Sequence, residues 1–286
     1  MFRIYDGRTK RAEPVGGARP GRLGIYLARP LAAGPARLGD LRACLIADLI
    51  RRVAELHQLW ASAWLHLPSG AAESAQVLRA ACDELNIYPL ELTDGPPEQM
   101  DVVITAPGTA AESGILCLVP GDTSFTAQDT ETAGASKAAV APRAAPGISQ
   151  ASLAPGATPG TFQASLAPAD LAARELDPLA LRLAFLTQHY RAPMGLGWQT
   201  LDAADQALRE WRKHVADWAR SSSKPMSAAY LRDVLAAFDD DLGTPAALDM
   251  LRALAGDGGV DPGSKFETFA YLDRLLGLDL ARDVGH

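Results

Sequence analysis

The 286-residue sequence predicts an α/β domain with a parallel sheet, followed by an all-helical bundle. Three observations support this prediction. Strand and helix patterns alternate up to about residue 119, a segment poor in large apolar residues follows, and helical periodicity then runs onward. We therefore expect three regions, at residues 1–119, 120–169 and 170–286.

The first region alternates strand and helix signals. A short apolar run at 22–28, bounded by Gly and Pro, is typical of a buried strand, and a helix with one apolar face follows from near Asp40. At 58–67 apolar residues take every second position, as in a strand. The further elements are a helix at 73–85 and strands at 101–105 and 114–119. Because helices normally bury both faces of a parallel sheet, we expect this sheet to be covered on both faces.

Residues 120–169 have a different composition, rich in Ala, Gly, Pro, Ser and Thr. The hexapeptide QASLAP occurs in them twice, at 150–155 and 163–168. Such a segment cannot bury enough apolar area to offset the entropy lost on ordering. The composition predicts a low-complexity loop that is largely disordered.

The third region has the strongest helical periodicity. Its longest apolar stripe recurs at steps of three and four residues: Leu201, Ala204, Leu208, Trp211, Val215 and Trp218. Thr200 is placed as the N-cap of that helix, and Thr244 as the cap of a later helix that begins with Pro245. With a helix within 177–191 and a final one at about 265–276, four or five helices are expected to form a bundle.

Charge and composition exclude several classes of protein. The net charge of −7, from 27 basic and 34 acidic residues, argues against tRNA as a tight partner, because phosphate neutralisation requires a basic surface. No run of 18 or more apolar residues appears, so we expect no membrane span. Cys44, Cys82 and Cys117 occur singly, without a CxxC motif or a Cys/His cluster. We expect buried thiols and a reducing, cytoplasmic location.

Three stretches of the sequence resemble bacterial cysteinyl-tRNA synthetases, which belong to the class I aminoacyl-tRNA synthetases. Residues 1–52 are similar to the family's N-terminal strand, zinc-cysteine loop and HIGH-motif helix, and AACDELNIYP (80–89) to the segment ending the next helical pair. Residues 176–211, followed by FDDDLGTPAAL (238–248), are similar to its helical bundle. The resemblance implies that residues 1–119 form a Rossmann-like, HUP-type domain of the nucleotide-binding kind.

The family's ATP and zinc sites have lost their key residues at the matching positions. The HIGH element matches residues 37–40, RLGD, which keep Gly39 but have no histidine. Arg37 is suited to holding a phosphate, whereas Asp40 repels one. The first zinc ligand matches Ala28, and no counterpart of the other ligands is found, so we expect no zinc site and no cofactor.

Further parts of the family's machinery are also missing. The stretch matching the KMSKS loop, 157–161, contains no lysine, and the loop after the second strand reads PSGAA at 68–72. The family's anticodon-reading extension has no counterpart after the bundle. These losses predict that the chain neither activates cysteine nor charges tRNA.

A degenerate ATP and amino-acid cleft is the remaining candidate ligand site. Trp64 and His66 end a predicted strand, where ligands bind in open α/β sheets, although packing roles are an alternative for both. The full set of candidate residues is Ala28, Arg29, Arg37, Gly39, Asp40, Trp64 and His66. No catalytic residue and no metal ligand is identified.

Two other charged or aromatic groups favour structural roles. The sequence His189-Tyr190-Arg191 matches a family motif that we interpret as joining the bundle to the first domain. Residues 239–241, three aspartates, are interpreted as solvated charge at the end of a helix.

Two functions stay open at this point. The first is a non-catalytic pseudo-synthetase that acts as a scaffold or regulator with a protein partner. The second is a repurposed enzyme of specialised metabolism that binds a small anionic or amino-acid-derived ligand in the old cleft. The sequence indicates neither the ligand or partner nor the oligomeric state.

Overall fold

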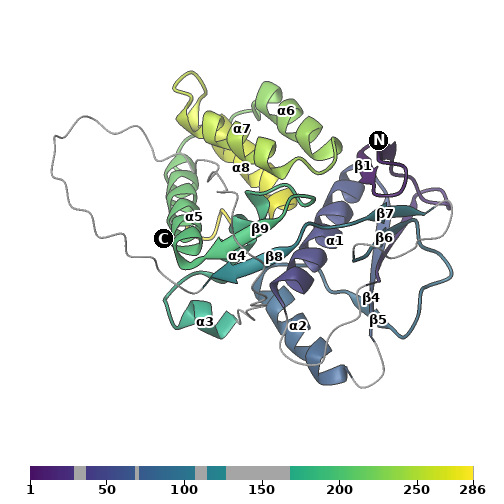
Figure 1. The fold of residues 1–286 in the computed structure, drawn as a ribbon. Coiled ribbons are helices and arrows are strands. Elements are labelled where there is room, and N and C mark those ends of the chain that lie inside the picture. The colour runs from purple at the N-terminus through teal and green to yellow at the C-terminus, as the bar shows by residue number, and fades with distance from the viewer. Residues whose placement is uncertain (29–36, 68–70, 107–114, 127–167, 286) are drawn as a thin grey trace.

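A five-stranded parallel sheet forms the centre of the first region (Figure 1). The computed structural model describes residues 1–28, 37–67, 71–106, 115–126 and 168–285. The strand order is β5-β4-β3-β6-β7. The strands are β3 (Arg22–Leu27), β4 (Trp60–His66), β5 (Glu91–Thr93), β6 (Val102–Ile104) and β7 (Leu116–Leu118). This sheet and the helices that follow it confirm the predicted fold class.

Helices α1 (Leu38–Leu56) and α2 (Ala72–Glu84) cover one face of the sheet. They connect β3 to β4 and β4 to β5, two steps in the same direction along the sheet, and right-handed crossovers place both on the same side. Leu23, Ile25 and Leu27 of β3 point into the main core with α1. In Figure 1 the labelled helices lie on this side of the sheet.

The expectation that helices cover both faces is wrong for the part of the chain that the structure describes. The connection from β5 back across the sheet to β6 is residues 94–101, which form turns and extended chain. A helical crossover usually needs a dozen or more residues, so this segment is too short to supply one. Tyr26, Val103 and Cys117 form a small apolar cluster on this face, separate from the main core.

An antiparallel hairpin precedes the sheet and packs beside β7. It consists of β1 (Arg3–Asp6) and β2 (Arg11–Pro14). The N–H of Gly7 donates to the carbonyl of Cys117 at 2.7 Å, which ties the hairpin to the sheet edge. This hairpin brings the N-terminal residues within reach of the helical region.

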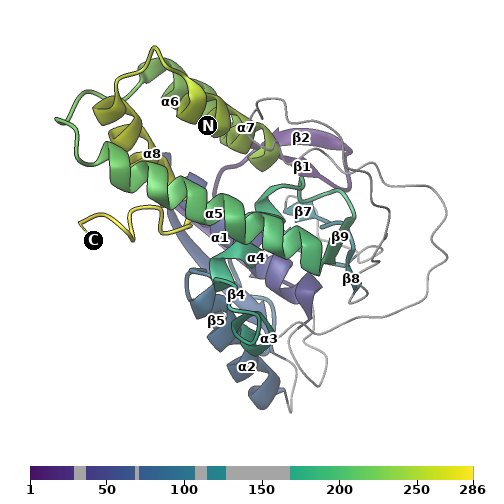
Figure 2. The same cartoon turned by 90° about the vertical axis from the view of Figure 1, so that its left-hand side faces the viewer.

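The C-terminal region is helical, as predicted. Its helices are α3 (Pro168–Ala172), α4 (Pro178–Leu186), α5 (Trp198–Trp218), α6 (Ala228–Asp239), α7 (Thr244–Gly256) and α8 (Pro262–Leu276). Figure 2 shows α5 running across α4, against which it packs. None of the described helices is long and apolar enough to cross a membrane.

A two-stranded parallel sheet is the main local departure from prediction. Strand β8 (Thr123–Thr126) lies in the segment predicted as a loop, and β9 (Met194–Gly197) in the region predicted as all-helical. Both strands have four residues, too few to give a periodic signal. Most of residues 120–169 lie outside the described chain, so the predicted domain boundaries and the loop stay predictions.

The two predicted helix caps are displaced. Helix α5 begins at Trp198 with Gly197 as its N-cap, and α7 begins at Thr244 with Gly243 as its N-cap. Tertiary contacts hold the first turn of α5, because the indole of Trp198 meets the ring of Phe125 edge-on at 5.1 Å and lies under the Arg174 guanidinium at 4.0 Å. These contacts outweigh the local capping preference of Thr200.

A buried ion pair joins the two regions. Arg182 of α4 is fully buried and donates to the carboxylate of Asp48 on α1 at 2.6 Å. Its other N–H groups reach the carbonyls of Leu85 and Asn86, at 2.9 and 3.0 Å. Burial lowers the pKa of Arg182, while the Asp48 carboxylate opposes that shift and keeps the guanidinium charged.

We predict that Arg182→Ala destabilises the chain by about 3–5 kcal/mol, because it leaves a buried carboxylate without its main cation. Urea denaturation followed by circular dichroism measures this change. Arg232→Ala is the matched control, since its side chain is 72% exposed and pairs only with its neighbour Asp233. The control should stay within about 0.5 kcal/mol of the wild type. Equal stability of the two variants would show that the ion pair is not the anchor.

Candidate functional site

The start of α1 is the first part of the predicted cleft. Arg37 is its exposed N-cap, with extended backbone, and its carbonyl accepts the N–H groups of Asp40 and Leu41 at 2.9 and 3.1 Å. Gly39 and Asp40 are half-buried in the first turn, so a carboxylate lies at the helix end that otherwise attracts anions. Arg29 lies outside the described residues.

Ala28, Trp64 and His66 belong to the opposite face of the sheet. Ala28 and Trp64 border the separate apolar cluster of Tyr26, Val103 and Cys117. The β4 residues that alternate with Trp64 and His66 belong instead to the main core, on the side of α1. Ala28 follows β3 directly, and its N–H donates to the carbonyl of Ile104 at 2.9 Å. The structure therefore divides the predicted cleft between the two faces of the sheet, and does not gather it around the start of α1.

Trp64 and His66 both have packing contacts on their face. The indole N–H of Trp64 donates to Glu91 on the neighbouring strand at 2.9 Å. The ring of His66 stands edge-on to Tyr26, with centroids 6.4 Å apart. The Nδ1 atom of His66 is buried and has no hydrogen-bond partner among the residues described. Sequence reasoning missed Tyr26 and Glu91 as neighbours, although the alternation along β4 placed the side chains on one face.

No metal centre is found in the described part of the chain. No group of three or more His, Cys, Asp or Glu side chains is arranged to hold a metal ion there. The three cysteines form no disulfide and are buried, one each in α1, α2 and β7. The absence of a zinc site remains a prediction, because the loop after Ala28 is outside the described residues.

Arg42 is a buried cation that sequence reasoning did not single out. It lies two residues after Asp40 and donates to the carbonyls of His189 and Ala192, both at 3.0 Å, and of Gly121 at 3.2 Å. Burial lowers the pKa of Arg42 to about 10, which still leaves the guanidinium charged at neutral pH. Because its donors are engaged with backbone carbonyls, Arg42 holds β8 and β9 to α1 and is not free to meet a phosphate.

The His189-Tyr190-Arg191 group has the joining role predicted for it. The hydroxyl of Tyr190 donates to the Asp241 carboxylate at 2.6 Å, and the same carboxylate accepts the N–H of Tyr5 at 2.8 Å. Arg191 pairs with Asp241 at 2.8 Å and stacks over the Tyr5 ring. Asp241 is therefore buried and paired, which corrects the prediction that all three aspartates at 239–241 are solvated.

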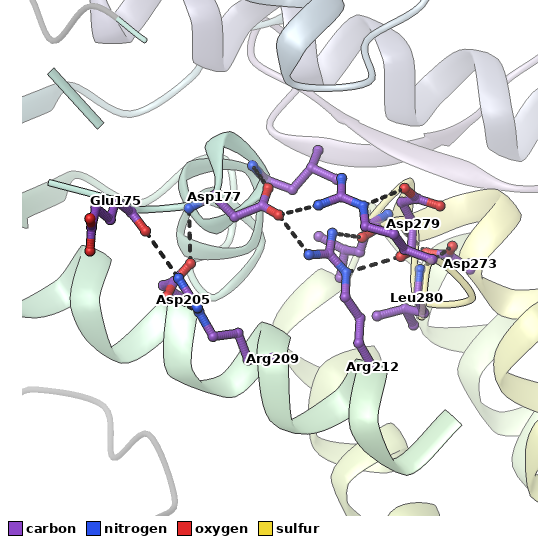
Figure 3. Close-up of polar contacts among 11 residues, drawn as sticks. Glu175, Asp177, Asp205, Arg209, Arg212, Asp273, Asp279 and Leu280 are labelled. Carbon is purple, nitrogen blue, oxygen red and sulfur yellow. Dashed lines mark hydrogen bonds and ion pairs between the residues drawn. The ribbon is translucent and has the colours of Figure 1, made fainter. Parts of the chain in front are cut away.

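A second charged cluster fastens the residues after α8 to the bundle (Figure 3). Asp177 caps α4 by accepting the N–H of Leu179 at 2.8 Å, and it also receives Arg212 of α5 and Arg282 at 2.6 and 2.5 Å. Asp273 accepts the N–H groups of two residues beyond α8, at 2.8 and 2.9 Å. Arg209, Arg212 and Arg282 each have a carboxylate partner, which indicates a structural role for the cluster.

Comparisons with known proteins relate part of the chain to a group of ligases. No family model matches the chain. Over 112 residues it is 37% identical to the L-cysteine:1D-myo-inositol 2-amino-2-deoxy-alpha-D-glucopyranoside ligase of Streptosporangium roseum, covering 37% of this chain and 26% of the ligase. The ligase of the same name from Rhodococcus erythropolis is 40% identical over 116 residues, covering 38% and 27%. That from Nocardiopsis dassonvillei is 38% identical over 114 residues, covering 38% and 27%.

The Rossmann-like fold and these partial matches together support a resemblance to the class I synthetases. More particularly, the chain is cysteinyl-tRNA synthetase-like, and related over a partial region to the cysteine ligases just named. The matches span about a quarter of the length of those relatives.

The Asp177 cluster predicts a loss of stability in acid. Burial alone raises the pKa of Asp177, but the hydrogen bonds from Arg212 and from the N–H of Leu179 outweigh it and hold the pKa below 3.8. Because the pKa is lower in the folded chain, the stabilisation is complete above the unfolded pKa and is lost as the pH falls below it.

We therefore expect Asp177→Asn to be less stable than the wild type at pH 7 and to lose less stability between about pH 5 and pH 3. Urea denaturation at several pH values tests this. Asp249→Asn, whose side chain is 73% exposed, serves as the control and should stay within about 0.5 kcal/mol at pH 7. Parallel pH curves for Asp177→Asn and the wild type would contradict the assignment.

Proposed function

We propose that the chain is a non-catalytic relative of the cysteine ligases and synthetases, acting as a scaffold or regulator for a protein partner. The observation that carries this proposal is the start of α1, where Arg37 and Asp40 stand in place of the phosphate-binding histidines. Buried contacts hold α1 in the domain, while the residues that the resemblance matches to the ATP-binding histidines are not histidines. A chain that has the fold but lacks the ATP-binding histidines fits a binding role better than a ligase reaction.

Energetics indicate how weakly ATP should bind at α1. Each charged or strong hydrogen-bond donor to a triphosphate contributes about 1.5–3 kcal/mol. The loss of three such donors removes more than about 4 kcal/mol, or roughly a thousandfold in affinity. The exposed N–H groups of the helix terminus return only about 0.3–1 kcal/mol, and Asp40 opposes even that attraction.

We predict that Mg-ATP binds at the start of α1 with a Kd of about 1 mM or weaker. We also expect no cysteine-dependent exchange of pyrophosphate into ATP. Calorimetric titration measures the affinity, and an isotope-exchange assay measures the reaction. A Kd below about 50 μM at this site, or any exchange above background, would contradict the proposal.

Substitutions at the start of α1 show whether the measured affinity for Mg-ATP belongs to that site. Asp40→Asn removes the negative charge from the first turn of α1 and should tighten Mg-ATP binding about two- to fivefold. Arg37→Ala should weaken it. If neither substitution changes the affinity, the nucleotide binds elsewhere on the chain.

A second function is favoured by the names of the relatives. Those ligases act on L-cysteine and an aminoglucosyl inositol, so the alternative proposal is a repurposed cleft that binds a cysteine-derived or amino-sugar ligand. Half-buried His66, with one nitrogen unpaired among the described residues, is the group available to recognise it.

A thermal-shift series distinguishes the two functions. The probes are L-cysteine and 1D-myo-inositol 2-amino-2-deoxy-α-D-glucopyranoside, each with and without Mg-ATP. A bound ligand at 100 times its Kd adds about 2.7 kcal/mol, which raises Tm by about 5–10 °C for a chain of this size. The scaffold proposal predicts no such rise, and instead co-purification with a partner at a fixed ratio. A rise that His66→Ala abolishes would favour the repurposed cleft.

A further inference from the structure

A cavity opens on the sheet face that faces away from α1. It has a volume of about 380 Å³ and lies at the amino ends of β3 and β4, where residues 97–101 cross the sheet. Its lining includes Arg19, Arg22, Trp60, Trp64, Glu98 and Asp101. The start of α1 and His66 lie toward the opposite, carboxyl edge of the strands, so among the predicted cleft residues that the structure describes only Trp64 lines this cavity.

Trp60 provides an exposed aromatic surface at the cavity. It is the first residue of β4, and its side chain is 73% exposed. Trp64 lies four residues further along the same strand, so both indoles are on the same face. Trp64 is held by its hydrogen bond to Glu91, whereas the Trp60 ring is open to solvent. An open indole face stacks readily on a flat ring.

Two guanidinium groups accompany the exposed indole. Arg22 is the direct cross-strand neighbour of Trp60, and Arg19 lies in the turn before β3. Both side chains line the cavity, and neither guanidinium has a hydrogen-bond or ion-pair partner among the residues that the structure describes. Arginine's planar fork of donors matches a carboxylate or a phosphate.

The lining also contains two carboxylates, so its formal charges balance. The Asp101 carboxylate is engaged by two backbone N–H groups, those of Ala18 at 2.6 Å and Gly24 at 2.7 Å. Glu98 is exposed and is the other carboxylate of the lining. Because Asp101 already accepts these two donors, the N–H groups of Arg19 and Arg22 are left to bind an anionic group of a ligand.

The walls of the cavity are set by the backbone. A Cβ atom at Gly24 would lie 2.5 Å from the carbonyl oxygen of Gln99, so the glycine is what allows residues 97–101 to lie against β3. The N–H of Asp101 donates to the Gly24 carbonyl at 2.8 Å, which closes the contact from both sides. A cavity held in this way needs little rearrangement on binding.

We propose that this cavity binds a small flat aromatic ring that carries one carboxylate or phosphate. The ring stacks on Trp60, and the anionic group meets Arg22 and Arg19. A ligand of this kind uses both unusual features of the cavity, the open indole and the unpaired cations. The proposal does not depend on the function proposed for the start of α1.

The test titrates the full chain with two probes of this chemistry, indole-3-acetate for the carboxylate and AMP for the phosphate. Indole, adenosine and inorganic phosphate supply the ring or the anion alone. Calorimetry measures affinity for every probe, and quenching of tryptophan fluorescence reports AMP, which has no indole of its own. We expect at least one of the two probes to bind about tenfold or more tightly than its ring or anion alone.

Substitutions at the exposed positions locate the binding. Trp60→Ala and Arg22→Ala should each weaken it about tenfold or more, while Arg232→Ala, at another exposed arginine, should not change it. Asp40→Asn should also leave it unchanged, which separates this site from the start of α1. The proposal is overturned if neither probe binds with a Kd below about 1 mM, or if Trp60→Ala and Arg22→Ala bind as the wild type does.

Discussion

The buried pair of Asp48 and Arg182 is the contact on which the rest of the structure depends. The Asp48 carboxylate accepts the side chains of Arg52 and Arg182 at 2.8 and 2.6 Å and the N–H of Tyr88 at 3.1 Å. A buried charge is tolerated only where its hydrogen bonds are complete, so α1 cannot shift without exposing several unpaired groups at once. The position of α1, and hence the place of its first turn, is therefore fixed by contacts at the middle of the helix.

The contacts that anchor α1 lie away from its first turn. Arg42 and Arg52 are engaged with backbone carbonyls or with Asp48. None of these contacts involves residues 37–40, so substitutions there leave the helix anchored. The residues of the first turn can therefore change while α1 keeps its place in the domain.

The large elements could be predicted from the sequence because their apolar residues recur with a regular period over many positions. Prediction failed where an element is short or where its bounds depend on tertiary contacts. The stripe from Leu201 to Trp218 identified α5, but its start depends on Trp198 packing against Phe125, which no local rule contains. The alternation of apolar and polar residues along β4 indicates that one face of the strand is polar, since a parallel strand that is buried on both faces is apolar at nearly every position. The candidate site stays a prediction, because a cleft that is proposed from a resemblance does not show on which face of the sheet each side chain lies.

The burial of all three cysteines also makes the chain a convenient object for chemical labelling. Cys44, Cys82 and Cys117 are the only cysteines in the sequence, and each is buried and outside any disulfide. Burial also raises the pKa of Cys117, which keeps its thiol protonated and slow to react. A cysteine introduced on the surface would therefore be labelled selectively by a thiol probe. The rates at which Cys44, Cys82 and Cys117 react with a thiol reagent would report the opening of α1, α2 and β7 separately.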